Sequence, residues 1–223
     1  MIFSRYLISA SLFIFSSFSF SQTYIAKFEN ESLDDWDEKS FVDQTQYQII
    51  QEGSTHVLKA TAKQSASGIG KEKTIDLFKT PYINWSWKIE NYLKGINEQS
   101  KSGDDYVARI YMVKSGGFFI WRTLALNYVW SSNQESGSIW DNAYAGKNAR
   151  MLALRSSSDP LNTWVQEKRN VYEDMIHLFG DKGSKAANEE AYRYIDVVAI
   201  MTDTDDSKGE ANAYYGDIFF TAE

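Results

Sequence analysis

The sequence predicts a mainly β fold, an antiparallel β-sandwich of jelly-roll type with one inserted helix. Short segments of alternating polar and apolar residues recur along the chain, and Gly, Asn, Asp and Ser separate them. The 223 residues include only 2 prolines, which suits a chain rich in strands because proline removes a donor from the hydrogen-bond ladder. About ten short strands favour a sandwich or barrel over alternating strands and helices.

The first element along the chain is a predicted signal peptide, residues 1–21. One basic residue is followed by a run of apolar, aromatic and Ser side chains, and small Ser residues precede a cleavage site before Gln22. This run is shorter than the ~20 residues that a spanning helix needs, so we expect no membrane span after cleavage. We therefore expect a bacterial periplasmic or secreted protein with a single β-sandwich domain, residues 22–223.

The strands of this domain are predicted from the alternation of apolar side chains, which places one face of each strand on a core. Their expected ranges are 24–28, 47–50, 56–62, 82–90, 106–113, 123–130, 151–155, 163–168, 192–202 and 213–221. Trp85 and Trp87 alternate with polar residues and are therefore expected to pack in the core.

One helix is predicted after the eighth of these strands. Asn170 and Glu173 form a capping box, an apolar stripe at helical spacing follows, and Gly180 is suited to end the helix. Asp174 is expected on the water-facing side with His177, three residues later. The two side chains are expected either to form a surface pair or to act in acid–base chemistry. The charged segment 181–190 is predicted to be a solvated loop.

Composition and charge exclude several classes of function. The formal net charge is −7, and an acidic chain repels nucleic acid and anionic lipid, so we expect neither as a partner. With no Cys and only 2 His, a tetrahedral zinc site is almost excluded. Neither a nucleophile elbow nor a phosphate-binding loop occurs in the sequence. We expect a monomer.

An acidic segment near the C-terminus is one candidate for a calcium site. Asp203, Asp205 and Ser207 are spaced as at the start of a calcium-binding loop. However, Lys208 occupies the position that requires Gly, and Tyr214 the position that requires Glu, which rejects an EF-hand. The alternatives are an acidic turn between strands and another kind of calcium site.

A second candidate for a structural calcium joins the two ends of the domain. Glu29 follows the first predicted strand and Asp217 lies in the last one. In many carbohydrate-binding jelly rolls the equivalent strands pair and their carboxylates hold calcium, an arrangement that this pair resembles. The alternative is that Asp217 is a surface residue on an edge strand.

The strand over residues 106–113 carries the most informative polar residue, Arg109. The alternation places Arg109, Asp105 and Tyr111 on the face opposite the core. An unpaired charge in the middle of a strand is costly, so Arg109 must pair with a carboxylate or meet a ligand. Asp105 is the expected partner, and the pair is expected to be either structural or part of a binding site.

The next strand carries Asn127 on the face opposite Leu126, Tyr128 and Trp130, and its amide must find a hydrogen-bond partner. Tryptophan residues occur in a segment rich in Ser, Asn and Gly, which is typical of loops above a sheet. Exposed tryptophans often hold sugar rings, and the alternative is packing. The tryptophans concerned are Trp121, Trp130 and Trp140.

Several of these motifs occur together in a known family. They are Trp85-Ser86-Trp87-Lys88, Gly103-Asp104-Asp105, Ala108-Arg109-Ile110-Tyr111, Asn127-Tyr128-Val129-Trp130, Trp164, Arg169-Asn170-Val171, Asp174, Phe179-Gly180, Met201-Thr202-Asp203-Thr204-Asp205 and Tyr214-Tyr215-Gly216-Asp217-Ile218. The chain thereby resembles the bacterial exported family called domain of unknown function 3047, from Phe28 to Phe220. The family favours Asn where this chain has Asp206. The resemblance implies an exported sandwich domain and carries no activity.

Three functional hypotheses follow from these features. The first is non-catalytic binding of a glycan or other envelope polymer; its candidate residues are Asp104, Asp105, Arg109, Asn127, Trp130, Trp140, Arg169 and Asp174. The second is a glycoside hydrolase or lyase, whose two carboxylates would come from Asp104, Asp105, Asp174 and Asp203. The third is a structural envelope protein whose aromatic residues all lie in the core.

Overall fold

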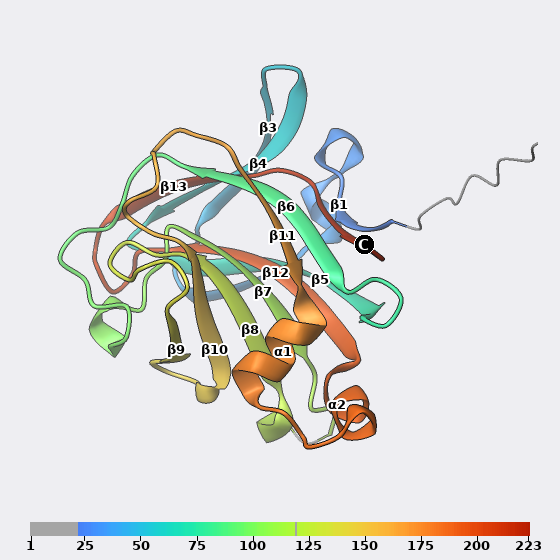
Figure 1. Ribbon diagram of the computed structural model, residues 1–223. Coiled ribbons are helices and arrows are strands. Elements are labelled where there is room, and N and C mark those ends of the chain that lie inside the picture. Colours follow the sequence, from blue (N-terminus) through green and yellow to red (C-terminus); the bar gives the residue numbers. More distant parts are fainter. Residues whose placement is uncertain (1–21, 119) are drawn as a thin grey trace, which may run out of the picture.

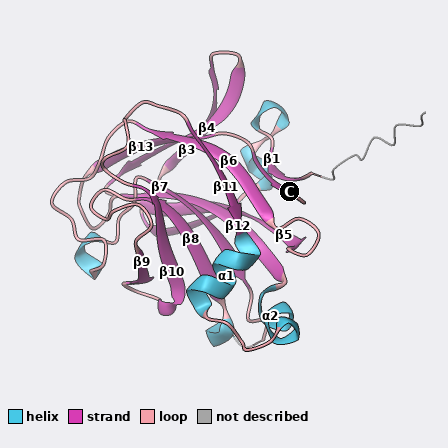
Figure 2. Ribbon diagram, viewed as in Figure 1, coloured by secondary structure: helices cyan, strands magenta, loops and turns pink. Residues whose placement is uncertain are grey.

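The computed structural model describes residues 22–118 and 120–223, and the predicted signal peptide lies outside them. Within this part of the chain, two seven-stranded sheets pack face to face as a β-sandwich, which confirms the predicted fold class (Figures 1 and 2). Among the described residues, none of the helices has the length and apolar character needed to cross a membrane.

The two sheets, here called sheet A and sheet B, combine strands that are distant in sequence. Sheet A has the order β1 (Thr23–Ala26), β14 (Ile218–Thr221), β6 (Tyr82–Ile89), β13 (Glu210–Tyr215), β4 (Thr55–Lys63) and β3 (Gln46–Glu52), and β11 (Val165–Asn170) also pairs with β6. Sheet B has the order β2 (Asp37–Val42), β5 (Ala66–Asp76), β12 (Tyr194–Asp203), β7 (Ala108–Lys114), β8 (Leu124–Trp130), β10 (Gly146–Arg155) and β9 (Ile139–Asn142).

The strand pairing departs from the prediction in one respect. β10 runs parallel to β8, with Met151 opposite Asn127. This is possible because β9 lies between them in the chain and runs antiparallel to β10. β2, β5 and β9 were also not predicted. In β5 the glycines Gly68 and Gly70 break the alternation that marks a strand in sequence, yet both pair with β12.

The first helix begins and ends as predicted. The backbone N–H of Glu173 donates to the Asn170 side chain at 3.2 Å, and α1 (Val171–Phe179) ends at Gly180, whose φ of +89° suits glycine. Asp174, however, is buried, so its expected place on the water-facing side was wrong.

A second helix was not predicted. α2 (Lys185–Tyr192) forms where a solvated loop was expected, and the Ser184 hydroxyl accepts from the N–H of Ala187 at 3.2 Å to cap it. Both helices lie at one end of the sandwich (Figure 1). Short 3₁₀ turns complete the described elements: Phe28–Asn30, Leu33–Asp35, Lys101–Gly103 and Ile120–Arg122.

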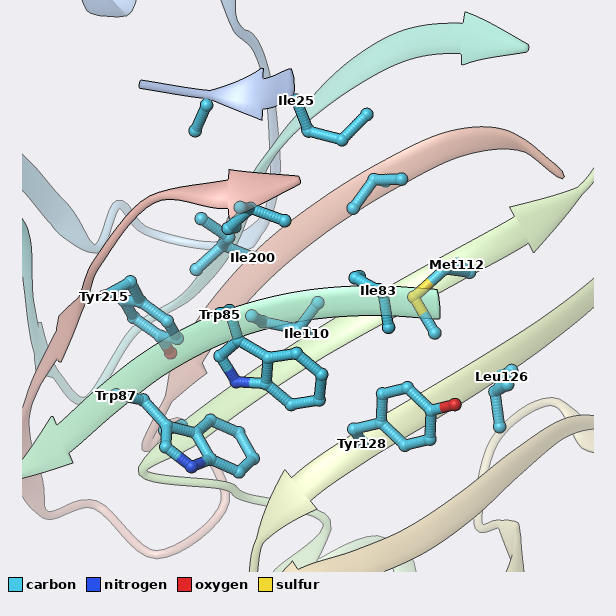
Figure 3. Packing of buried hydrophobic residues seen from close by; sticks show 14 of the residues in the cluster. Ile25, Ile83, Trp85, Trp87, Ile110, Met112, Leu126, Tyr128, Ile200 and Tyr215 are labelled. Atoms are coloured by element: carbon cyan, nitrogen blue, oxygen red, sulfur yellow. The ribbon is translucent and has the colours of Figure 1, made fainter. Parts of the chain in front are cut away.

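Aromatic side chains from both sheets fill the core. Trp85 and Trp87 of β6 are buried as predicted, and Figure 3 shows them beside Tyr128 of β8. The ring centroids of Trp85 and Tyr128 lie 5.5 Å apart, and those of Trp87 and Trp130 lie 5.7 Å apart. Because Tyr128 and Trp130 occupy the inner face of β8, their neighbour Asn127 is turned to the outer face of sheet B.

Candidate functional site

The outer face of sheet B is hollowed into a pocket of about 470 Å³. Every strand of this sheet contributes to its lining, and the residues with polar groups come from β7, β8, β9, β12 and the adjoining loops. The lining residues are Phe41, Val42, Ala66, Asp104, Arg109, Tyr111, Ala125, Asn127, Asn142, Tyr144, Ala145, Ala149, Met201, Asp203, Asp205 and Asp206.

Arg109 lines this pocket and is nine-tenths buried, with a side-chain exposure of 9%. Its Nη2 donates to Asp203 Oδ2 at 2.8 Å and to Met201 Sδ at 2.7 Å. Its guanidinium also lies 5.1 Å from the Tyr106 ring and 5.8 Å from the Tyr111 ring. The partner of Arg109 is thus Asp203 of the neighbouring β12 rather than the expected Asp105.

The pairing leaves a buried donor of Arg109 without a partner. Its Nε is buried and has no hydrogen-bond partner among the described residues. A buried donor without a partner costs on the order of 1–3 kcal/mol, so this arrangement of Arg109 is not one that stability alone favours.

Asp105 instead organises the acidic turn that follows β12. Its two carboxylate oxygens accept from the backbone N–H groups of Asp206 and Ser207. This turn brings Asp205 and Asp206 to the pocket. One carboxylate oxygen each from Asp105, Asp203 and Asp205 lies within 4.8 Å of the others, a grouping that the spacing in sequence only partly indicated.

Asp104 is held at the edge of the pocket by a chain of hydrogen bonds. Its Oδ1 accepts from the Tyr106 hydroxyl at 2.9 Å, and its Oδ2 accepts from Asn142 Nδ2 at 2.7 Å. Trp140 stacks on Tyr106 and donates its Nε1–H to the same hydroxyl at 3.3 Å. Trp140, which was a predicted candidate for contact with the ligand, is therefore buried behind the pocket and supports Asp104 through Tyr106.

Asn127 lines the pocket and satisfies its amide as the sequence required. Its Nδ2 donates to the carbonyl oxygens of Ala125 at 3.1 Å and Arg150 at 3.4 Å. Ala125 on the same strand and Ala149 on the next also line the pocket, and their small side chains leave room above the floor.

Aromatic rings border the polar floor. Phe41 and Tyr144 are each 59% exposed, so the hypothesis that all aromatic residues lie in the core was wrong. Tyr111 lies across Gly68 of β5, where an added Cβ would be 3.1 Å from the Tyr111 hydroxyl. Glycine at this position therefore makes room for the Tyr111 ring.

Burial changes the acidity of the pocket's carboxyl groups. It raises the pKa of Asp203 above its ordinary value, against the opposing effect of Arg109. The pKa values of Asp205 and Asp206 are also raised, mainly by burial and then by the neighbouring negative charge of Asp105. The carboxyl groups thus repel further negative charge and favour a hydrogen-bonding or cationic partner.

Glu98, a fully buried residue that the sequence did not single out, lies behind the pocket. It accepts hydrogen bonds from the Ser131 hydroxyl and the Ser132 N–H, and burial raises its pKa to about 7. Because the unfolded chain releases this proton near pH 4.5, we expect the free energy of unfolding to fall as the pH rises from about 4 to about 8.

The variant Glu98→Gln tests this pH dependence. It removes the titrating group, so above about pH 7 it should be more stable than the parent by on the order of 3 kcal/mol, with the advantage gone below about pH 4. Urea denaturation across this range measures the difference. A constant offset between the two proteins would contradict the assignment.

Three of the predicted ligand residues lie away from the pocket. Trp130 is fully buried on the inner face of β8, where its Nε1 donates to the Ser156 carbonyl at 3.3 Å. Its role is therefore packing in the core, the alternative to contact with a sugar. Arg169 and Asp174 form a two-pronged ion pair at 2.6 and 2.9 Å beside α1, and Tyr128 donates to Asp174 at 2.6 Å. These contacts tie the helix to the core instead of lining the pocket.

The predicted calcium pair, Glu29 and Asp217, lines a separate hollow on sheet A. Glu29 is paired with His56 Nδ1 at 2.7 Å, and Asp217 accepts from the N–H of Phe28 at 2.9 Å. Among the described residues, no third His, Asp or Glu joins them in a metal-binding group. A calcium ion at this pair therefore stays a prediction.

The sequence itself matches one known family. A family model described as "Protein of unknown function (DUF3047)" covers residues 34–219, which is most of the chain. The chain belongs to the DUF3047 family. The match includes every residue that lines the pocket. No curated protein matches the sequence.

Solved structures share the sandwich fold of this DUF3047 protein at low identity. A family 11 carbohydrate-binding module from Clostridium thermocellum is 10% identical, with a TM-score of 0.47 over 90% of this chain and 94% of that one. The xyloglucanase domain of NopAA from Sinorhizobium fredii is 10% identical, with a TM-score of 0.46 over 92% of this chain and 100% of that one. At these identities and TM-scores the similarity is one of overall sandwich architecture only.

The sequence missed several pocket residues of the DUF3047 protein. Asn142 and Tyr144 lie on and after the unpredicted strand β9, and Phe41 lies on the unpredicted strand β2. No periodicity marks these short strands, because Phe41 and its neighbours on β2 are exposed on both faces. The sequence likewise does not indicate that Glu98 is buried, because its neighbours in the chain are mostly polar.

Proposed function

We propose that the pocket on sheet B binds a glycan or another hydroxyl-rich envelope polymer without cleaving it. One observation carries this proposal: buried, fixed polar groups converge on the floor of a pocket that is bordered by aromatic rings. Arg109 offers guanidinium donors, while the half-buried Asp205 and Asp206 offer acceptors. Sugars combine hydroxyl groups with apolar ring faces, which is the chemistry that this lining complements.

The size and charge of the pocket support the same proposal. A volume of about 470 Å³ lies within the range of roughly 300–1,000 Å³ that is typical of small-ligand sites. Because carboxylates outnumber the single guanidinium among the described lining residues, phosphate-bearing ligands are disfavoured. We propose that the protein acts as an exported monomer, so its ligand would belong to the cell envelope or its surroundings.

Binding is favoured over catalysis because the buried carboxylates are already engaged. Both oxygens of Asp104 and both oxygens of Asp203 accept hydrogen bonds from protein donors. A catalytic acid or nucleophile needs an oxygen directed at the substrate. The raised pKa of Asp203 is the one observation that favours a glycoside hydrolase or lyase, and release of reducing ends from bound sugars would establish that alternative.

Calorimetric titration of the protein with cell-wall and capsular sugars tests the proposal. We expect at least one sugar to bind, and Tyr111→Ala to weaken that binding at least about tenfold because the variant removes the ring over Gly68. Trp164→Ala is the matched control, since Trp164 lines the separate hollow on sheet A. Absence of binding across the panel, or sensitivity to Trp164→Ala alone, would contradict the proposed site.

A further inference from the structure

The pocket on sheet B carries more negative charge than its basic residue can balance. Asp104, Asp203, Asp205 and Asp206 line it, while Arg109 is the single basic residue among the described lining residues. The ion pair between Arg109 and Asp203, at 2.8 Å, accounts for that one positive charge. Three pocket-lining carboxyl groups therefore have no basic partner in the lining.

The lysines around the pocket compensate this charge only weakly. Lys101 Nζ lies 5.4 Å from the Tyr144 ring, Lys39 Nζ lies 5.3 Å from the Phe41 ring, and Lys208 is close enough to lower the pKa of Asp206. All three lysines are exposed, so water and salt screen them.

The acidic groups, in contrast, are screened much less. Asp104 and Asp203 are buried, while Asp205 and Asp206 are half-buried. Asp105, also buried, adds its charge from just behind the acidic turn. Burial, and after it the negative charge of Asp105, raises the pKa values of Asp205 and Asp206.

We propose that the glycan bound by this pocket carries positive charge in the form of free amino groups, as a de-N-acetylated amino sugar does. This inference rests on the proposed glycan binding and specifies its substrate class. An ammonium group supplies three donors, which suits the half-buried carboxylates of Asp205 and Asp206. The hydroxyl of Tyr144 lies 3.3 Å from both Asp206 oxygens, so this side chain borders the same carboxylate.

A primary amine suits the pocket better than a metal ion does. The carboxylates of Asp105, Asp203 and Asp205 lie close together, but the fixed guanidinium of Arg109 lies 2.8 Å from Asp203. A divalent cation at this cluster would be held against that positive charge. An ammonium group on a sugar ring can instead approach Asp205 and Asp206 from the open side of the pocket.

Titration with oligosaccharides of equal length tests the inference. The probes are glucosamine oligomers, N-acetylglucosamine oligomers and a uronic acid oligomer, each titrated into the full protein by calorimetry at neutral pH and low salt. We expect the glucosamine oligomer to bind at least about tenfold more tightly than its N-acetylated counterpart, and the uronic acid oligomer to bind weakest. Added salt should reduce the preference.

Paired variants assign the preference to the pocket. The double variant Asp205→Asn, Asp206→Asn should remove most of the preference for the amino form. The matched control is Asp34→Asn, Asp35→Asn, a second pair of adjacent aspartates that is exposed and lies outside the pocket lining. This control reduces the net negative charge equally and should preserve the preference.

Each contrary result has a separate meaning. Equal or tighter binding of the N-acetylated oligomer would overturn the inference and leave glycan binding standing, as would a preference that survives Asp205→Asn, Asp206→Asn. Binding that is lost with EDTA and restored with calcium would show that the carboxylates serve a metal, and would also overturn it. Failure of every sugar in the wider panel would overturn the proposed function and this inference together.

Discussion

Replacing Asp203 with alanine is expected to destabilise the protein by about 3–5 kcal/mol, because it leaves the guanidinium of Arg109 buried and unpaired. Arginine cannot release its proton in a protein, so the stranded charge has no means of neutralising itself. Asp203→Ala also removes the acceptor of the Tyr106 N–H, which lies 3.0 Å from Asp203 Oδ1.

The reverse replacement, Arg109→Met, is expected to cost less, about 1–2 kcal/mol at neutral pH. The remaining Asp203 can take up a proton, since burial raises its pKa and the loss of Arg109 raises it further. Urea denaturation of both variants measures the asymmetry. Equal losses, or a greater loss for Arg109→Met, would show that the pair is not buried as described.

Arg109→Met should also abolish glycan binding while the protein remains folded. Methionine keeps much of the length of the side chain but removes every donor, including the unused Nε. Calorimetry on the folded variant separates this loss from instability. Retained affinity would place the ligand away from Arg109.

Replacing Trp130 with alanine has the second large expected effect, a loss of about 3–5 kcal/mol in stability. The indole is fully buried against Trp87 between the two sheets, and alanine would leave a cavity there. Trp130→Phe, which keeps a ring and loses the hydrogen bond to Ser156, should cost only about 1–2 kcal/mol.

The same pair of variants distinguishes packing from ligand contact at Trp130. Because the side chain lies on the inner face of β8, Trp130→Phe should leave sugar affinity within about twofold of the parent. Thermal denaturation and calorimetry on one preparation give both quantities. A stable Trp130→Ala variant that no longer binds sugar would show that the indole faces the ligand instead.

Much of the sandwich could be predicted because alternation within a strand is a local property. The alternation correctly predicted that Arg109 and Asn127 face away from the core. It also predicted that Tyr128 and Trp130 face the core. The capping signal at Asn170 is equally local, and the predicted helix begins there. Gly68 and Gly70 obscured β5 because glycine adds no side chain to the alternation, although both residues pair with β12.

The partners of the polar residues could not be predicted, because they depend on which strands become neighbours. Arg109 meets Asp203 only because β12 pairs with β7, with Met201 opposite Arg109. Asp105, two positions away in sequence, instead holds the acidic turn. Asp174 was assigned to the surface because nothing in its own segment indicates that Tyr128 and Arg169 enclose it.

The central claim is that the outer face of sheet B is the glycan-binding surface. Titrating isotopically labelled protein with the tightest-binding sugar, and following the backbone amide signals by NMR, tests it most directly. The account predicts that the largest shifts fall on β7, β8 and β12 around Arg109, Asn127 and Asp203, and that the hollow at Trp164 and Asp217 is unaffected. Largest shifts at that sheet A hollow, with none around Arg109, would contradict it.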